Sequence, residues 1–244
     1  MELWWLIMIG AACAGFVQGL SGFAFGLVAM SIWAWLLEPQ LAAVLTVFGA
    51  LVGQLQAAVT LRRKASWPLL WPFLAGGLLG IPIGVYLLPL IDIRWFKLAL
   101  GTLLIVWCSI MLLIAYMPPI RWGGRFLNGV AGWIGGILGG FGGFTGPIPT
   151  LWCTLRGWPK DQQRAVIQNF NLIMLAVAMI SYLATGLVTT SMFPMMLLVV
   201  PSVLIPVWLG GRLYIKMNDA QFRRLVLGLL LLSGIAMIVS ASLV

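Results

Sequence analysis

Long apolar stretches separated by short polar segments make up almost the whole chain. They cover residues 3–37, 41–61, 67–90, 95–117, 126–155, 165–185, 192–211 and 225–244. A helix that crosses a bilayer needs about 20 residues, and six of the stretches fit that length. The first and the fifth are too long for one span and too short for two. The pattern therefore predicts an all-α polytopic membrane protein.

Glycine interrupts both long stretches near the middle. The interruptions lie at residues 15–26 and 132–143, and Pro147 and Pro149 follow the second one. Glycine costs about 1 kcal/mol in a helix interior, and proline removes a helical hydrogen bond. We therefore expect two half-helices in each stretch, joined by unwound backbone. Such backbone is tolerated in a membrane only where it faces protein or a water-filled cavity.

The two interrupted stretches align with each other at an offset of 117 residues. This alignment places Gly15, Gly19, Gly22 and Gly26 over Gly132, Gly136, Gly139 and Gly143. A second block aligns in the same order at an offset of 127, residues 92–101 over 219–228. The sequence therefore predicts two copies of one unit, an N-terminal transmembrane repeat at 1–120 and a C-terminal one at 121–244.

The distribution of basic residues predicts how the two copies are oriented. If every stretch crossed once, the short loops would carry nine basic residues on one side and five on the other. If the fifth stretch enters and returns as a hairpin, only Arg94 and Lys97 remain on the second side. The first side then carries Arg62, Arg63, Lys64, Arg121, Arg125, Arg156, Lys160, Arg164, Arg212, Lys216, Arg223 and Arg224. The positive-inside rule favours this hairpin.

A hairpin in the fifth stretch, and by similarity in the first, leaves three spans in each half. An odd number of crossings inverts the second copy relative to the first. Inverted repeats with broken helices are a recurring plan of secondary transporters. The predicted architecture is therefore two inverted repeats of about four hydrophobic segments each, with the first and fifth segments broken and re-entrant.

Composition excludes several classes of function. Hydrophobic residues make up 62% of the chain and charged residues 8%, whereas soluble domains carry about 25% charged residues. The net charge of +9 is therefore attributed to topology signals and not to nucleic acid. Cys13, Cys108 and Cys153 are isolated, which favours small lipid- or core-facing residues over a disulfide or a metal site. No cofactor is expected, and no in-membrane acid, base or Ser/His pairing supports an enzyme.

The two glycine segments, each followed by a helix break, resemble the sulfite exporter TauE/SafE family, also called the toluene-sulfonate uptake permease family. In the second half the resemblance rests on residues 139–147, which run from a glycine series into a proline, and on Gly-Trp-Pro at 157–159. In the first half, Phe23-Ala24-Phe25 replaces part of the usual glycine series. The resemblance covers nearly the whole chain. It implies transport, usually export, of sulfite, organosulfonates such as sulfoacetate, or related carboxylates across the bacterial inner membrane.

An anion inside the membrane needs hydrogen-bond donors, and no Lys or Arg lies in the interior of a predicted span. Half-helix N-termini offer backbone N–H groups and a positive dipole end, and neutral side chains offer further donors. The predicted substrate-binding residues are Gln18, Ser21, Gly22, Gly26, Thr46, Gly139, Gly140, Gly142, Gly143, Thr145, Gly146, Gln168, Asn169 and Asn171.

Structural alternatives exist for these residues. Close helix packing would explain the glycines, and hydrogen bonding between helices would explain the amides. Gln54 and Gln56 are equally open to both interpretations. Arg156 and Arg164 are predicted to fix topology rather than to attract anions at a cytoplasmic mouth.

The sequence thus predicts a multi-pass, alternating-access exporter of a small anion, with an anion-conducting channel on the same scaffold as the alternative. Its expected partners are the anion and lipid, without nucleic acid, and whether it forms a homodimer stays open. Histidine is absent, and the five acidic residues fall at segment ends, so no proton relay is predicted. An inside-negative potential favours anion exit by about 2.3 kcal/mol per charge per 100 mV.

Overall fold

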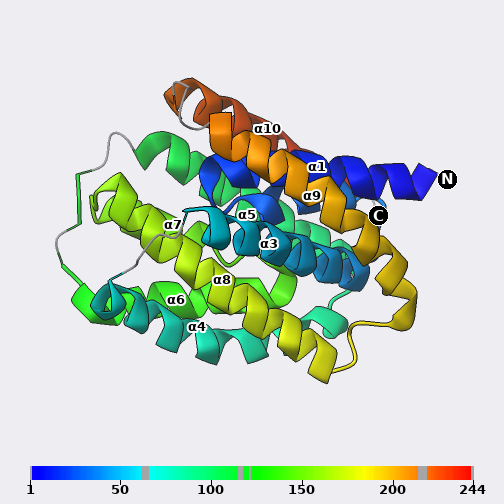
Figure 1. The fold of residues 1–244 in the computed structure, drawn as a ribbon, viewed down its shortest axis with the longest axis horizontal. Coiled ribbons are helices and arrows are strands. Elements are labelled where there is room, and N and C mark those ends of the chain that lie inside the picture. The colour runs from blue at the N-terminus through cyan, green and yellow to red at the C-terminus, as the bar shows by residue number, and fades with distance from the viewer. Residues whose placement is uncertain (1, 62–65, 115–117, 121, 214–218, 243–244) are drawn as a thin grey trace.

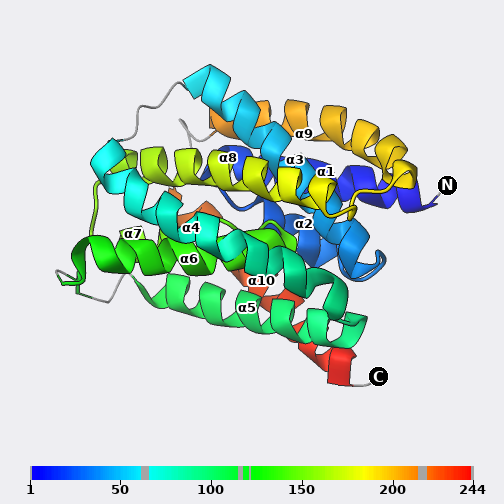
Figure 2. The same ribbon diagram turned by 90° about the horizontal axis from the view of Figure 1, so that it is seen from below.

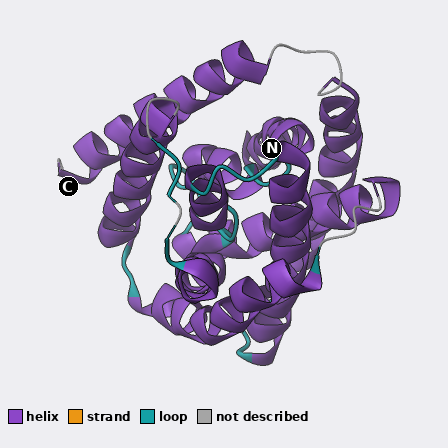
Figure 3. Ribbon diagram, turned by 90° about the vertical axis from the view of Figure 1, so that its left-hand side faces the viewer, coloured by secondary structure: helices purple, strands orange, loops and turns teal. Residues whose placement is uncertain are grey.

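The computed structural model describes residues 2–61, 66–114, 118–120, 122–213 and 219–242, which fold into helices joined by short loops (Figure 1). The helices are α1 (Glu2–Ser21), α2 (Phe25–Trp33), α3 (Pro39–Leu61), α4 (Trp67–Leu87), α5 (Ile93–Leu113), α6 (Gly124–Gly142), α7 (Pro147–Leu155), α8 (Lys160–Ala184), α9 (Phe193–Leu213) and α10 (Asp219–Ser242). Short 3₁₀ turns at Leu88–Leu90 and Thr190–Met192 precede α5 and α9. Figure 3 shows helices and loops but no strand in these ranges, which confirms the all-α prediction.

Within the described ranges, six helical segments are long and apolar enough to cross a membrane. They are Leu3–Ser21, Pro39–Thr60, Trp67–Leu90, Ile93–Leu113, Lys160–Ala184 and Thr190–Leu213. Five of them coincide with stretches predicted to be spans. The stretch at 225–244 falls in α10, where the described apolar segment is the shorter Leu230–Ser242. The chain is therefore a polytopic membrane protein.

Both long stretches are interrupted, as predicted, but residues 15–21 and 132–142 of the glycine segments stay helical, so each break lies further along the chain than expected. Residues 22–24 separate α1 from α2, and residues 143–146 separate α6 from α7. The half-helices α2 and α7 have nine residues each, which is about 13 Å at 1.5 Å per residue. Each pair therefore consists of a long helix followed by a short one that returns.

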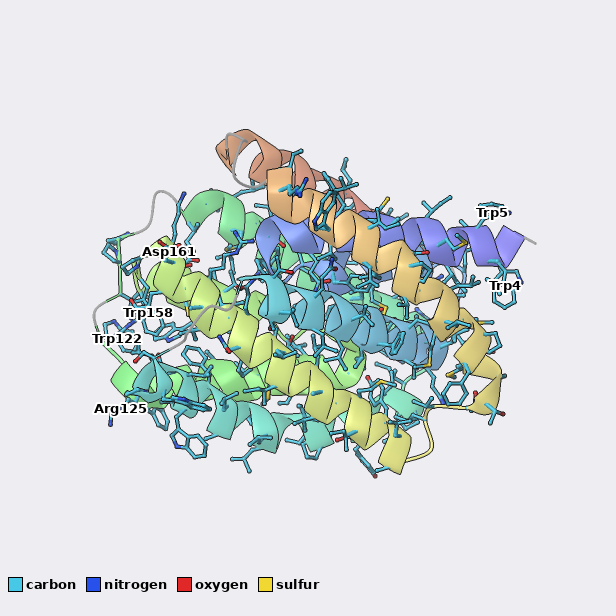
Figure 4. The ribbon with its side chains drawn as sticks, in the orientation of Figure 1. Trp4, Trp5, Trp122, Arg125, Trp158 and Asp161 are labelled. Atoms are coloured by element: carbon cyan, nitrogen blue, oxygen red, sulfur yellow. The ribbon has the colours of Figure 1, made fainter. Side chains whose placement is uncertain are left out.

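The bundle has two distinguishable ends. In Figure 1, α1 and α3 both run away from the end that holds the N-terminus, so α2 and the residues after it bring the chain back to that end. Helices α6 and α8 both start at the other end, so α7 returns the chain there. Figure 4 shows Trp4 and Trp5 at the N-terminal end, and Trp122, Arg125, Trp158 and Asp161 at the opposite one.

We call this opposite end the basic end, because Arg125, Arg156, Lys160 and Arg212 lie on helix termini located there. Arg94 and Lys97 lie at the start of α5, at the N-terminal end. The grouping of the described cations agrees with the hairpin prediction. Arg62, Arg63, Lys64, Arg121 and Lys216 lie outside the described residues, as do the side chains of Arg223 and Arg224.

Glycines bring two helix pairs into backbone contact. On α4, Gly76, Gly80 and Gly84 face the backbone of α6, and on α6, Gly132, Gly136 and Gly140 face the backbone of α4. Figure 2 shows these helices side by side. A Cβ atom at any of these six positions would clash with a carbonyl oxygen of the partner helix. Small residues that allow such an approach are typical of membrane helix interfaces.

The second pair, α1 and α9, packs in the same way. Gly19 of α1 faces the carbonyl oxygen of Val207, and Gly210 of α9 faces that of Phe16. The long helix of each hairpin thus packs on the third long helix of the other half, α1 on α9 and α6 on α4. The last helices of the two halves, α5 and α10, meet through Gly101 and Gly234.

The register predicted for the two glycine segments is wrong by one helical turn. The glycines that end α1 and α6 with positive φ are Gly22 (+87°) and Gly143 (+78°), an offset of 121 and not 117. The packing follows the same offset, since Gly19 faces α9 as Gly140 faces α4. Gly26 is therefore not the counterpart of Gly143. Because glycine recurs every three or four residues here, an alignment on glycines alone slips easily by a turn.

The three cysteines carry no disulfide and lie as expected for small apolar residues. Cys13 is exposed on α1, where lipid surrounds the bundle, whereas Cys108 and Cys153 are buried.

Asp92, one of the acidic residues at segment ends, caps α5. Its carboxylate accepts a hydrogen bond of 3.1 Å from the backbone N–H of Trp95.

We expect the basic end to face the cytoplasm, because short loops rich in Lys and Arg are retained there. In a variant whose native cysteines are replaced by alanine, Arg125→Cys and Lys160→Cys should resist an impermeant thiol reagent added to intact cells. Arg94→Cys, at the other end, should be labelled. Labelling of only one of the first two positions would contradict the hairpin formed by α6 and α7.

Candidate functional site

The two helix breaks touch each other inside the bundle. Gly22 ends α1 and Gly143 ends α6, each with a left-handed backbone that favours glycine. Gly26, in the first turn of α2, lies against the second break, since a Cβ atom there would be 2.8 Å from the carbonyl oxygen of Gly143. The breaks therefore form one continuous region of irregular backbone.

Polar side chains satisfy the backbone of the first break. The amide Nε2 of Gln54 donates to the carbonyl oxygen of Gly22 at 2.7 Å. The Ser21 hydroxyl accepts hydrogen bonds from the N–H groups of Phe23 and Ala24, at 3.3 and 3.1 Å, and donates to Val17. These bonds give Ser21 and Gln54 a structural role, because unpaired backbone groups are costly in a membrane.

Gln18 and Gln56 also bond to neighbouring backbone. Gln18 Nε2 donates to the carbonyl oxygen of Ala50 at 2.9 Å, and Gln56 Nε2 donates to that of Leu204 at 3.0 Å. The side-chain oxygens of both residues are buried without a hydrogen-bond partner among the described residues. One end of each amide therefore fixes α3 to a neighbouring helix, and the other end remains available.

Arg164 lies inside the bundle, contrary to the prediction that it only flanks a span. This residue is only 9% exposed, and its Nη2 donates a hydrogen bond to the carbonyl oxygen of Gly19 at 3.2 Å. Arg164 Nε and Gln168 Nε2 both lie 3.5 Å from the point that a Cβ atom on Gly22 would occupy. The helix α8 begins at Lys160, one turn before the predicted apolar stretch, and this extra turn carries Arg164 into the bundle.

Two buried side chains without partners face the second break. Thr46 of α3 is fully buried, and its methyl group lies 3.0 Å from the point where a Cβ atom on Gly143 would stand. Asn171 of α8 is 1% exposed, and its Nδ2 lies 3.1 Å from the corresponding point on Gly146. Within the described part of the chain, neither the Thr46 hydroxyl nor either polar atom of the Asn171 amide has a hydrogen bond.

An unpaired buried polar group costs about 1–3 kcal/mol, and native interiors contain few of them. Thr46 and Asn171 carry three such atoms within the described chain, and the two side chains lie against residues 143–146 through the Thr46 methyl group and Asn171 Nδ2. Thr150, which the sequence did not point to, adds a buried hydroxyl in the first turn of α7 that has no partner among the described residues. The arrangement offers neutral donors to a ligand that would bind at the second break.

The remaining predicted residues have mostly packing contacts. Gly140 faces the backbone of α4, and its carbonyl oxygen accepts a hydrogen bond of 2.7 Å from Tyr182 Oη. Gly139 and Gly142 face Thr145 and Phe144 of their own hairpin. Asn169 donates to the carbonyl oxygen of Ala165 on its own helix at 2.8 Å. A role of these residues in binding stays a prediction.

The N-terminus of α7 offers fewer backbone donors than expected. Pro147 and Pro149 both lie in its first turn and lack an N–H group. The carbonyl oxygen of Pro147 instead accepts a hydrogen bond of 3.0 Å from Trp107 Nε1. Side-chain donors therefore contribute more to the second break than the helix end does.

Comparison with known proteins adds one match. The family described as Sulfite exporter TauE/SafE matches residues 7–237, nearly the whole chain. No curated protein and no solved structure matches the chain. The match covers both helix breaks and all the helices that contact them. The chain therefore belongs to the sulfite exporter TauE/SafE family, a family of membrane transporters that export sulfite and related anions.

Proposed function

We propose that the protein exports sulfite, an organosulfonate such as sulfoacetate, or a related carboxylate across the bacterial inner membrane. The observation that carries this proposal is the pair of buried side chains at the second break, Thr46 and Asn171, whose polar atoms form no hydrogen bond with the described residues. The Asn171 amide and the Thr46 hydroxyl both offer N–H or O–H donors. The oxygen atoms of a sulfonate or sulfite are acceptors that such donors can bind.

The neutral character of these donors suits a transported anion. A cation at the second break itself would compensate the charge fully and would hold the anion tightly at the deepest point of its path. An amide and a hydroxyl bind it with hydrogen bonds of about 1.5–3 kcal/mol each, the range for bonds to charged groups. The membrane potential then assists release on the outer side, which accounts for export without an acidic or histidine relay.

We further propose that the two halves, residues 1–120 and 121–244, are inverted copies that exchange access by movement of the hairpins. The reciprocal packing of α1 on α9 and of α6 on α4 supports this relation, as do the equivalent end glycines Gly22 and Gly143. The contact of Gly26 with Gly143 joins the two hairpins at their breaks. A shift of one hairpin would therefore change the surroundings of the other.

A transport assay tests the proposal. Purified protein in liposomes loaded with sodium sulfite should release sulfite at a rate that saturates with its concentration. Sulfite on the outer side should accelerate exchange of labelled sulfite, because a carrier returns faster when it is loaded. Sulfoacetate and acetate compared in the same assay would identify the substrate class. A conductance that does not saturate would favour a channel, and absence of flux for all three anions would contradict the proposal.

A further inference from the structure

Helix α8 carries a line of three polar side chains along one face. Arg164, Gln168 and Asn171 are spaced at i, i+4 and i+7, which places them on the same side of a helix. Helix α8 begins at the basic end, so Arg164 is the outermost of the three and Asn171 the deepest. At 1.5 Å per residue the two are about 10 Å apart along the axis.

The outer two residues of this line meet at the first helix break. Arg164 Nε and Gln168 Nε2 lie at the same distance, 3.5 Å, from the missing Cβ atom of Gly22. Any side chain at residue 22 would fill the space between these two donors. Gln168 is half-buried, and its side chain forms no hydrogen bond with the described residues. The pair thus places two N–H donors next to a backbone position that has no side chain.

Burial of Arg164 is favourable only with compensation of its charge. Moving a cation out of water costs several kcal/mol even after relaxation. The carbonyl oxygen of Gly19 at the end of α1 supplies part of this compensation, since the C-terminus of a helix carries a partial negative charge. The planar guanidinium has five N–H donors, so beside this bond it is well suited to bind an oxyanion.

We infer that Arg164 and Gln168 form a second oxyanion site over Gly22, which loads sulfite or a sulfonate from the basic end before it reaches Asn171. This inference rests on the proposed function. At the corresponding point on the second break, above Gly143, the nearest described atoms belong to Thr46 and Val47, which are both uncharged. The anion therefore meets a charged site first and a neutral site second, so that apparent affinity is higher on the side of the basic end.

The test measures half-saturating sulfite concentrations separately from the two sides of oriented membrane vesicles. Arg164→Gln removes the charge and keeps a neutral N–H donor on the same face of α8. We expect the half-saturating concentration on the side of the basic end to rise about tenfold or more, the loss of one hydrogen bond to a charged group. On the opposite side it should change less than twofold.

Lys160→Gln is the matched control, because it removes the same charge one turn earlier on the same helix, at its first residue. It should leave both half-saturating concentrations unchanged. Arg164→Lys restores the charge without the planar fork and should show a smaller rise on the same side. This variant also serves if Arg164→Gln does not reach the membrane.

Unchanged half-saturation in Arg164→Gln, or an equal rise on both sides, would overturn the loading site. The proposed function is judged by a different variant, Asn171→Leu. If Asn171→Leu abolishes transport while Arg164→Gln behaves like the parent, the loading site alone is refuted. If Asn171→Leu transports normally, the binding role of the second break is refuted as well.

Discussion

Asn171→Leu is expected to abolish anion transport and to leave the folded protein as stable as the parent, or more stable. The side chain is 1% exposed, and both of its polar atoms lack partners among the described residues. Leucine has a similar volume and removes the desolvation cost of the amide, which is about 1–3 kcal/mol. A purely structural amide would show the opposite result, because its removal would destabilise the fold.

Asn128→Leu provides the matched control, since Asn128 is also a buried asparagine at 3% exposure. Its Oδ1 accepts a hydrogen bond of 2.7 Å from Trp152 Nε1. Leucine there should lower the unfolding temperature by leaving the indole N–H without its partner. Sulfite flux per folded molecule and the unfolding temperature in detergent separate the two cases. Equal losses of stability in both variants would refute a ligand role for Asn171.

Gly136→Ala is expected to destabilise the protein by about 1–3 kcal/mol, the range for overpacking in a tight interior. A Cβ atom on Gly136 would clash with the carbonyl oxygen of Gly77 and stand 2.8 Å from its Cα atom. Backbone atoms cannot rotate away as a side chain can. Helices α4 and α6 must therefore separate, and their other glycine contacts weaken with them.

Gly129→Ala on the same helix is the control. The added methyl group would lie 3.5 Å from the carbonyl oxygen of Pro72, an ordinary contact with the same partner helix. Because alanine favours a helix by about 1 kcal/mol over glycine, this variant should be as stable as the parent or slightly more so. Tryptophan fluorescence during heating measures both variants. Equal stability of Gly136→Ala and Gly129→Ala would contradict the close backbone packing of α4 on α6.

Much of the architecture could be predicted from the sequence because membrane helices are governed by few forces. Apolar length predicts spans, and glycine followed by proline predicts the break after Gly142. The clustering of basic residues predicts which loops share an end of the bundle. Each of these signals is local or is a sum along the chain, so it can be interpreted without knowledge of tertiary contacts.

The role of each polar residue in the site could not be predicted in the same way. Gln54 and Asn171 both carry a side-chain amide near a break. The Gln54 amide donates to the carbonyl oxygen of Gly22, whereas the Asn171 amide forms no hydrogen bond with the described residues. Whether an amide finds a partner depends on which backbone groups other helices bring within 3 Å. The burial of Arg164 could not be predicted for a related reason. It depends on how far α1 reaches toward the basic end, because the Gly19 carbonyl oxygen that Arg164 contacts lies near the end of α1.

The reciprocal packing of the hairpins has a consequence for how the chain is made. Helix α1 packs on α9, which begins at Phe193, and ribosomes add about 5–20 residues per second. Helix α1 must therefore wait roughly 10–35 s in the membrane before its partner is synthesised. Helix α4 likewise exposes its glycine face until α6 arrives. The glycine faces of α1 and α4 are covered only by helices of the second half. A chain released after residue 120 would therefore expose these faces to the proteases that remove incomplete membrane proteins.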